Sequence, residues 1–215
     1  MSLKALALLA LVALGACSTA EPVWAPDATV AQARFVAEAP RSITLYTVIA
    51  NRNNSGAHSG LLINASEQVL FDPAGSWQHP RIPERNDVHF GITPKMVAYY
   101  IDYHARETFR VVEQTIIVSP EVAELVKQRA LAYGAVPKAQ CSNSISSILA
   151  GVPGFEGLKS SWFPNKLSDS YGTLPGVTTR TITDDDADSN HGVLILQSKA
   201  DIANAELAAR DAAAQ

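Results

Sequence analysis

Apolar runs alternate with short turn-forming segments along the chain from about residue 41 to residue 198. The runs near 42–50, 58–64 and 67–72 are short and bounded by turn residues, which predicts three strands that follow one another in sequence. Two further strands are expected at 108–118 and at 193–197. The segment after residue 72 is rich in Pro, His and Arg and is interpreted as a loop through residue 87.

Helices are predicted by capping signals. Thr93-Pro94 and Ser119-Pro120 each place an N-cap residue before a proline at the first helical position. Helices are therefore expected from residue 94 to about 105 and from residue 120 to a stop at Gly134. A third helix is expected to begin around Cys141 and to end near Gly151, followed by a loop-rich stretch. Because paired strands come first and helices are segregated after them, the predicted fold class is α+β.

Composition divides the chain into four segments. Residues 1–16 begin with a positive charge at Lys4 and continue into an apolar stretch too short to span a bilayer, which predicts a signal peptide. Residues 17–40 are interpreted mainly as a tether, with a possible short helix over 28–38 capped by Asp27. Residues 41–198 are expected to form one domain of adequate size for a core, and residues 199–215 an Ala-rich helix or tail.

The signal peptide ends at a cysteine. Cys17 closes the run Leu14-Gly15-Ala16-Cys17 directly after the apolar stretch. This run resembles the lipobox of bacterial lipoproteins, which implies cleavage before Cys17 and a lipid on this residue. We therefore expect the protein to be anchored to a membrane of the bacterial cell envelope rather than to span it. Ser18 resembles the sorting residue of lipoproteins in the outer membrane that face the periplasm.

The charge of the mature chain excludes one class of partner. Loss of residues 1–16 removes Lys4 and leaves 16 basic against 21 acidic residues, without a basic run. Nucleic acid is therefore not an expected partner, because phosphate contacts require clustered basic side chains. The expected membrane contact runs through the lipid on Cys17.

Cys141 is the remaining cysteine, so it has no disulfide partner on its own chain once Cys17 is lipidated. Cys141, Ile145, Ile148 and Leu149 follow helical spacing, which places the thiol on a buried stripe. A cysteine in the first helical turn is favoured as a thiolate by unpaired N–H groups and the helix dipole, and the same groups can stabilise an oxyanion. The alternative interpretation is a buried core cysteine without chemistry.

A histidine and an acid are available to activate this thiol. His58 begins a predicted strand and shares one face with Gly60 and Leu62, and the glycine indicates close approach by another element, expected to be the helix that carries the thiol. Asp72 ends the next strand. A three-residue hairpin loop at 64–66 would place Asp72 opposite His58, whereas a two-residue loop would place it on the other face.

This order of residues resembles the circularly permuted papain-like amidases, which include the permuted NlpC-type cell-wall peptidases and the lecithin:retinol acyltransferase-like proteins. The resemblance rests on residues 56–72 and 140–150. It implies a permuted papain-like fold with Cys141 as nucleophile, His58 as base and Asp72 as orienting residue. It also implies a cysteine hydrolase or acyltransferase acting on an amide or ester, with peptidoglycan peptides the first substrate class and other acyl groups the next.

Several alternatives stay open. His191 is a second candidate base, because it also enters a predicted strand and gives the unpermuted order of the same superfamily. His89 is an alternative orienting residue. The polar cluster of His79, Glu84, Asp87 and His89 lacks a zinc-binding pattern, so neither a metal nor a cofactor is expected. A non-catalytic lipoprotein that binds or organises cell-wall components is the alternative function, and protein partners are left open.

Overall fold

A seven-stranded antiparallel sheet forms the centre of the molecule in the computed structural model, which describes residues 20, 22–190 and 192–213. The strands lie in the order β4-β5-β3-β2-β1-β6-β7. They are β1 (Ser42–Ala50), β2 (Gly56–Asn64), β3 (Gln68–Phe71), β4 (Glu84–Arg85), β5 (Val88–His89), β6 (Phe109–Ile117) and β7 (Thr178–Ile182). The helices are α2 (Asp27–Ala33), α3 (Pro94–His104), α4 (Pro120–Tyr133), α5 (Cys141–Leu149), α6 (Pro164–Tyr171) and α7 (Val193–Ala213). The predicted α+β class is therefore confirmed.

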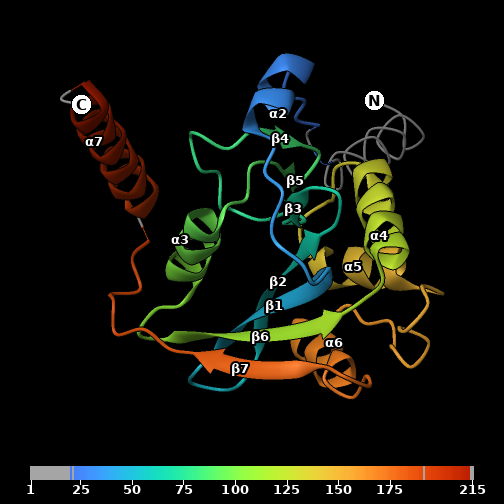
Figure 1. Ribbon diagram of the computed structural model, residues 1–215. Helices are drawn as coiled ribbons and strands as arrows, with labels where there is room; N and C mark the ends of the chain where they lie inside the picture. The colour runs from blue at the N-terminus through green and yellow to red at the C-terminus, as the bar shows by residue number, and fades with distance from the viewer. Residues whose placement is uncertain (1–19, 21, 191, 214–215) are drawn as a thin grey trace, which may run out of the picture.

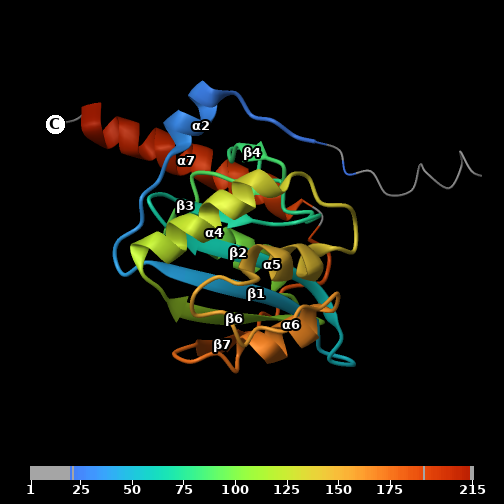
Figure 2. The same cartoon turned by 90° about the vertical axis from the view of Figure 1, so that its right-hand side faces the viewer.

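Helices cover both faces of this sheet. Figure 2 shows α4, α5 and α6 in front of the strands, and Figure 1 shows α3 and α7 on the opposite side. Side chains alternate along β1, so that Ile43 and Leu45 join the core under α4 and α5, whereas Tyr46 joins a second core under α3. The sheet thus separates two apolar layers, and a residue's parity along a strand decides which layer it enters.

The capping signals in the sequence are confirmed. Thr93 Oγ1 accepts a hydrogen bond from the Met96 N–H at 3.3 Å at the start of α3. Ser119 Oγ accepts one from Val122 N–H at 3.3 Å at the start of α4, which ends before Gly134 with φ of 89°. A left-handed φ favours glycine because it has no Cβ, which explains why α4 stops at this residue.

The C-terminal third differs from the sequence prediction. Residues 193–197 belong to α7 and not to a strand, and the expected domain boundary at residue 198 falls inside this helix. The stretch expected to be loop-rich contains both α6 and strand β7. An apolar run as short as Val193-Leu194-Ile195-Leu196 fits a strand or a helix equally well, so its pattern alone misled the prediction.

The segment expected to be a tether lies against the domain between residues 22 and 40. Ala25 N–H donates to the Glu84 carbonyl at 2.9 Å, and Gln68 N–H donates to the Phe35 carbonyl at 2.8 Å. The short helix in this segment is α2, which ends at Ala33; Asp27 is its first residue and not its cap. The predicted signal peptide, Cys17 and His191 lie outside the described residues.

No helix in the described ranges combines the length and the apolar character needed to cross a bilayer.

Candidate active site

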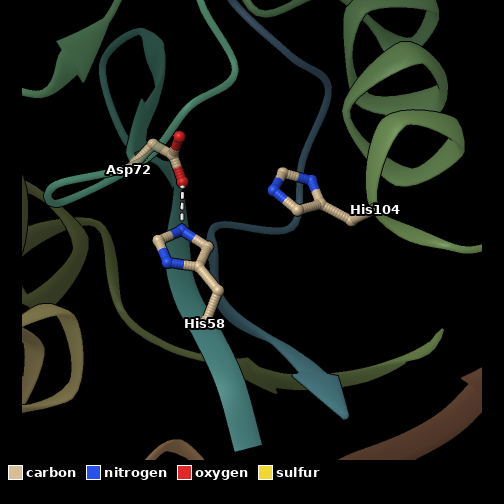
Figure 3. Close-up of side chains that lie close together, drawn as sticks. All are labelled: His58, Asp72 and His104. Atoms are coloured by element: carbon tan, nitrogen blue, oxygen red, sulfur yellow. Dashed lines mark hydrogen bonds and ion pairs between the residues drawn. The ribbon is translucent and has the colours of Figure 1, made fainter. Parts of the chain in front are cut away.

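An ion pair between His58 and Asp72 forms the centre of the candidate site. His58 Nε2 lies 2.6 Å from Asp72 Oδ1, and Tyr100 donates a hydrogen bond to the same oxygen at 2.9 Å. Figure 3 shows His58 pointing from its strand toward the carboxylate. Asp72 is almost completely buried, so its charge is compensated by these two partners and not by water.

The β2–β3 register explains how the two residues meet. Asn64 pairs with Gln68, so the hairpin loop is 65–67 and not the predicted 64–66. Extending this register places Asp72 opposite Gly60 and diagonal to His58, whereas the prediction placed it directly opposite. Because moving the loop by one residue moves each pairing partner by two, Asp72 stays on the same face as His58.

Gly60 is required by a close contact, although not the contact that was expected. A Cβ at this position would lie 2.2 Å from the Tyr100 hydroxyl and 3.4 Å from Asp72 Oδ1. Helix α3 therefore approaches Gly60 with Tyr100, whereas the sequence suggested an approach by the thiol helix. The absent side chain leaves room for the hydrogen bond from Tyr100 to Asp72.

Helix α5 contacts β2 on the opposite face, where Ser142 Oγ lies 3.1 Å from Ser59 Oγ and both side chains are buried. The pairing between β2 and β3 stops at Leu61, so the edge of β2 beside residues 56–60 is not covered by β3. His58 and the backbone of Ser59 lie near Cys141 at this edge and lower the pKa of its thiol. The thiol of α5 therefore lies near the imidazole past the end of β3, although the His58 ring is on the face of the sheet that α3 covers.

The charges in this group reinforce one another. Burial lowers the pKa of His58, but the charge and hydrogen bond of Asp72 outweigh burial and raise the pKa to about 10. Burial raises the pKa of Asp72, but the neighbouring imidazolium outweighs it and holds this pKa well below its ordinary value. Burial also raises the pKa of the Cys141 thiol, yet hydrogen bonding and charge from His58 leave that pKa lowered. These directions favour a thiolate–imidazolium pair.

The structure adds His104 of α3 to this group. Its ring lies parallel to that of His58, with 5.6 Å between centroids. Its Nδ1 donates to the Tyr100 carbonyl at 2.8 Å, which leaves the other ring nitrogen directed toward the His58–Asp72 pair (Figure 3). Burial lowers the pKa of His104 to about 4, so this ring is neutral at pH 7. The i, i+4 spacing of Tyr100 and His104 was the available signal for their shared face.

A cavity of about 300 Å³ opens beside His58, with His104, Tyr103, Ser76, Arg106 and Asp188 among its lining residues. Cys141 is not one of the lining residues and is only 7% exposed. The cavity therefore gives access to the imidazole from the α3 side, whereas the thiol is almost closed off.

Two groups of side chains in the described part of the chain could hold a metal ion. They are His58 with Asp72 and His104, and Asp102 with Asp184 and Asp186. Ligand atoms of one zinc ion at about 2.0–2.2 Å stand roughly 3.3 Å apart in tetrahedral geometry. The 2.6 Å separation of His58 Nε2 and Asp72 Oδ1 is instead a hydrogen-bond distance, so we interpret the first group as an ion pair. In the second group Asp102 is half-buried and pairs with Arg106, as does the exposed Asp186.

The remaining candidates His79 and His89 both pack against Trp77 and line one pocket with Glu84. His89, the alternative orienting residue, is buried in β5 against Trp77, and Asp72 rather than His89 bonds His58. His79 stacks on Tyr99 of α3. Neither metal-ligand group of the described residues includes His79 or His89.

No protein-family model, no curated protein and no solved structure matches this chain. Its function must therefore be argued from its own residues.

Proposed function

We propose that this protein is a cysteine hydrolase or acyltransferase with a permuted papain-like fold, tethered to a membrane of the bacterial cell envelope through a lipid on Cys17. The observation that carries the proposal is the buried ion pair of Asp72 and His58, with Cys141 near enough for this imidazole to lower the pKa of the thiol. A thiol nucleophile requires a neighbouring base and a group that orients this base, and the three residues supply these parts.

The reaction begins with the thiolate–imidazolium pair. Cys141 Sγ attacks the carbonyl carbon of an amide or ester and forms a C–S bond, while the carbonyl electron pair moves onto oxygen. Free N–H groups in the first turn of α5 are the expected donors to this oxyanion. When the tetrahedral intermediate collapses, the bond to the leaving group breaks, and the His58 imidazolium gives its proton to the leaving nitrogen or oxygen.

The acyl-enzyme then reacts with a second nucleophile. In hydrolysis, His58 removes a proton from water, the resulting oxygen attacks the thioester, and Cys141 leaves as a thiolate. In acyl transfer, an acceptor amine or hydroxyl takes the place of water. Asp72 stays ionised throughout and stabilises the imidazolium. The cell-envelope location makes peptidoglycan peptides the first substrate class to test, followed by lipid or protein acyl groups.

The 7% exposure of Cys141 favours a second candidate function. A thiol that is closed off from solvent and absent from the cavity lining is also compatible with a non-catalytic lipoprotein that binds or organises cell-wall components. In that case, Cys141 would act as a core residue of the domain.

Thiol labelling across a pH series separates the two functions. An enzyme is expected to react rapidly with iodoacetamide at pH 6, because its thiolate persists below the ordinary cysteine pKa, and the His58→Ala variant is expected to lose this reactivity. Slow labelling that requires unfolding, with an ordinary thiol pH profile, would count against catalysis. Cleavage of peptidoglycan fragments by the wild type but not by the Cys141→Ser variant then tests the substrate class.

A further inference from the structure

Asp87 connects the two segments that carry the candidate catalytic residues. It lies in the turn between β4 and β5 with a positive φ of 66°. Its backbone carbonyl accepts the Asp72 N–H at 2.8 Å, and its side-chain Oδ1 accepts the Ala74 N–H at 3.3 Å. Asp87 is therefore bonded at two points to the segment that begins with Asp72.

The second carboxylate oxygen reaches a different part of the chain. Asp87 Oδ2 accepts the Val136 N–H at 2.6 Å. Val136 lies in the connection between α4 and α5, and its side chain is buried in the core. This connection leads directly into Cys141, so one carboxylate bridges the approach to the thiol and the loop of the orienting acid.

From this bridge we infer that Asp87 is a positioning residue, which holds the Asp72 loop and the segment before Cys141 at the spacing that the Cys141–His58–Asp72 chain requires. The inference rests on the proposed function only for its effect on catalysis. Asp87 itself touches no reacting atom. A small displacement of either segment would separate the thiol from the imidazole, and misplacement by about 1 Å can lower an enzymatic rate roughly 10²-fold.

The same carboxylate titrates close to neutral pH. Burial raises the pKa of Asp87 to about 6; the Val136 and Ala74 N–H groups oppose this rise, whereas the negative charges of Glu84 and Asp72 add to it. Glu84 of β4 also accepts the Asp87 N–H at 3.2 Å. Below pH 6 a proton must sit on an oxygen that already faces an N–H donor, so one of the two bridging contacts weakens.

Activity and stability are expected to respond to this proton in opposite directions. A carboxyl group whose pKa is raised by folding binds its proton more tightly in the folded state. Its contribution to the free energy of unfolding therefore increases as pH falls from above 6 toward 3.8. A loss of activity over the same range would then report loosened positioning and not unfolding.

The test compares Asp87→Asn with Asp27→Asn. Asp27 pairs with Arg85 on β4, so its substitution removes a carboxylate bonded to the same hairpin, while the contacts to Ala74 and Val136 remain. We expect iodoacetamide to label the Cys141 thiol of Asp87→Asn roughly 10- to 100-fold more slowly than that of the wild type at pH 7.5. The labelling rate of this variant, plotted against pH, should also lack the inflection near pH 6. The control variant should retain the rate and the inflection of the wild type. Wild-type reactivity and pH profile in Asp87→Asn would overturn the inference.

A measurement on the unmodified protein covers the case in which Asp87→Asn does not fold. The amide resonances of Ala74 and Val136 are expected to shift together with a midpoint near pH 6 in an NMR titration of the wild type. Amides that shift independently, or not at all near this pH, would contradict the bridge. Because this readout requires no activity, it stays informative if the protein proves to be non-catalytic.

Discussion

Asp72 meets His58 diagonally across the β2–β3 hairpin, with Nε2 and Oδ1 separated by 2.6 Å. The carboxylate belongs to the residue directly after β3, and its burial makes the imidazole its main counter-charge. This geometry holds the ring in one orientation and fixes which nitrogen faces the acid. The other nitrogen is then available to the thiol, as the proposed mechanism requires.

The Asp72→Asn substitution is expected to lower kcat/KM by roughly 10²- to 10⁴-fold, the range that a positioned acid–base pair contributes. The amide keeps the size of the side chain but removes the charge that stabilises the imidazolium. The pKa of Cys141 should therefore rise, and thiolate absorbance near 240 nm followed against pH would measure this rise. Unchanged thiolate absorbance at pH 6 in this variant would show that Asp72 does not support the pair.

The same ion pair predicts how stability depends on pH. The folded pKa of His58 is raised to about 10, so its contribution is complete below the unfolded value of 6.5 and is lost as pH rises through about 10. The folded pKa of Asp72 is lowered, so its contribution is present above 3.8 and is lost as pH falls below that value. Urea unfolding at pH 6.5 and pH 9 would test the high-pH limb.

The proteins to compare at the two pH values are Cys141→Ser and the double variant Cys141→Ser/Asp72→Asn, because the thiol of Cys141 then does not titrate. The difference between their unfolding free energies is expected to be larger at pH 6.5 than at pH 9. An equal gap at the two pH values would mean that the folded protein does not hold the His58 proton more tightly than the unfolded chain.

Much of the scaffold was predictable because local signals and tertiary structure agree. The caps Thr93 and Ser119 lie at the true starts of α3 and α4, and β1 is an apolar run buried on both faces. Strand β7 is different: it is an edge strand that pairs with β6 on one side, and nearly all of its residues are exposed. Such a strand carries no apolar alternation, so sequence patterning could not find it.

The meeting of His58 and Asp72 was predictable from the sequence, but the packing around them was not. His58 and Asp72 share a face because the pairing between β2 and β3 differs from the predicted pairing by two residues, which leaves each side chain on its face. The alternation of side chains along β2 does not determine which helix packs against Gly60. That helix is α3, because of how the helices are distributed over the two faces of the sheet. For the same reason, Tyr100 and His104 were missed as neighbours of Asp72.

The Gly60→Ala substitution tests whether close approach by Tyr100 matters. Its methyl group would meet the Tyr100 hydroxyl at 2.2 Å, so the tyrosine must move and its hydrogen bond to Asp72 must weaken. We expect a loss of about 1–3 kcal/mol in unfolding free energy, the range of an overpacked core, together with reduced thiol reactivity.

The matched control is Gly157→Ala, where the added methyl group would meet only a Leu174 side-chain carbon, at 3.5 Å. Chemical denaturation should give this variant a stability close to that of the wild type. If Gly60→Ala were as stable and as reactive as Gly157→Ala, the contact between Gly60 and Tyr100 would not constrain the site.

The buried hydroxyl pair of Ser59 and Ser142 fixes α5 to β2 directly beside the thiol. Ser142→Ala alone should cost about 1–3 kcal/mol, because the Ser59 hydroxyl is left buried without this partner. The double variant Ser59→Ala/Ser142→Ala should recover part of that loss, since no hydroxyl then stays unpaired. Ser147→Ala, on the exposed side of α5, measures how much a serine-to-alanine change stabilises this helix by propensity alone. This amount is subtracted from the effect of Ser142→Ala. Urea unfolding of the wild type, Ser59→Ala, Ser142→Ala and the double variant gives the coupling energy, and strict additivity would mean that the two hydroxyls do not stabilise this junction together.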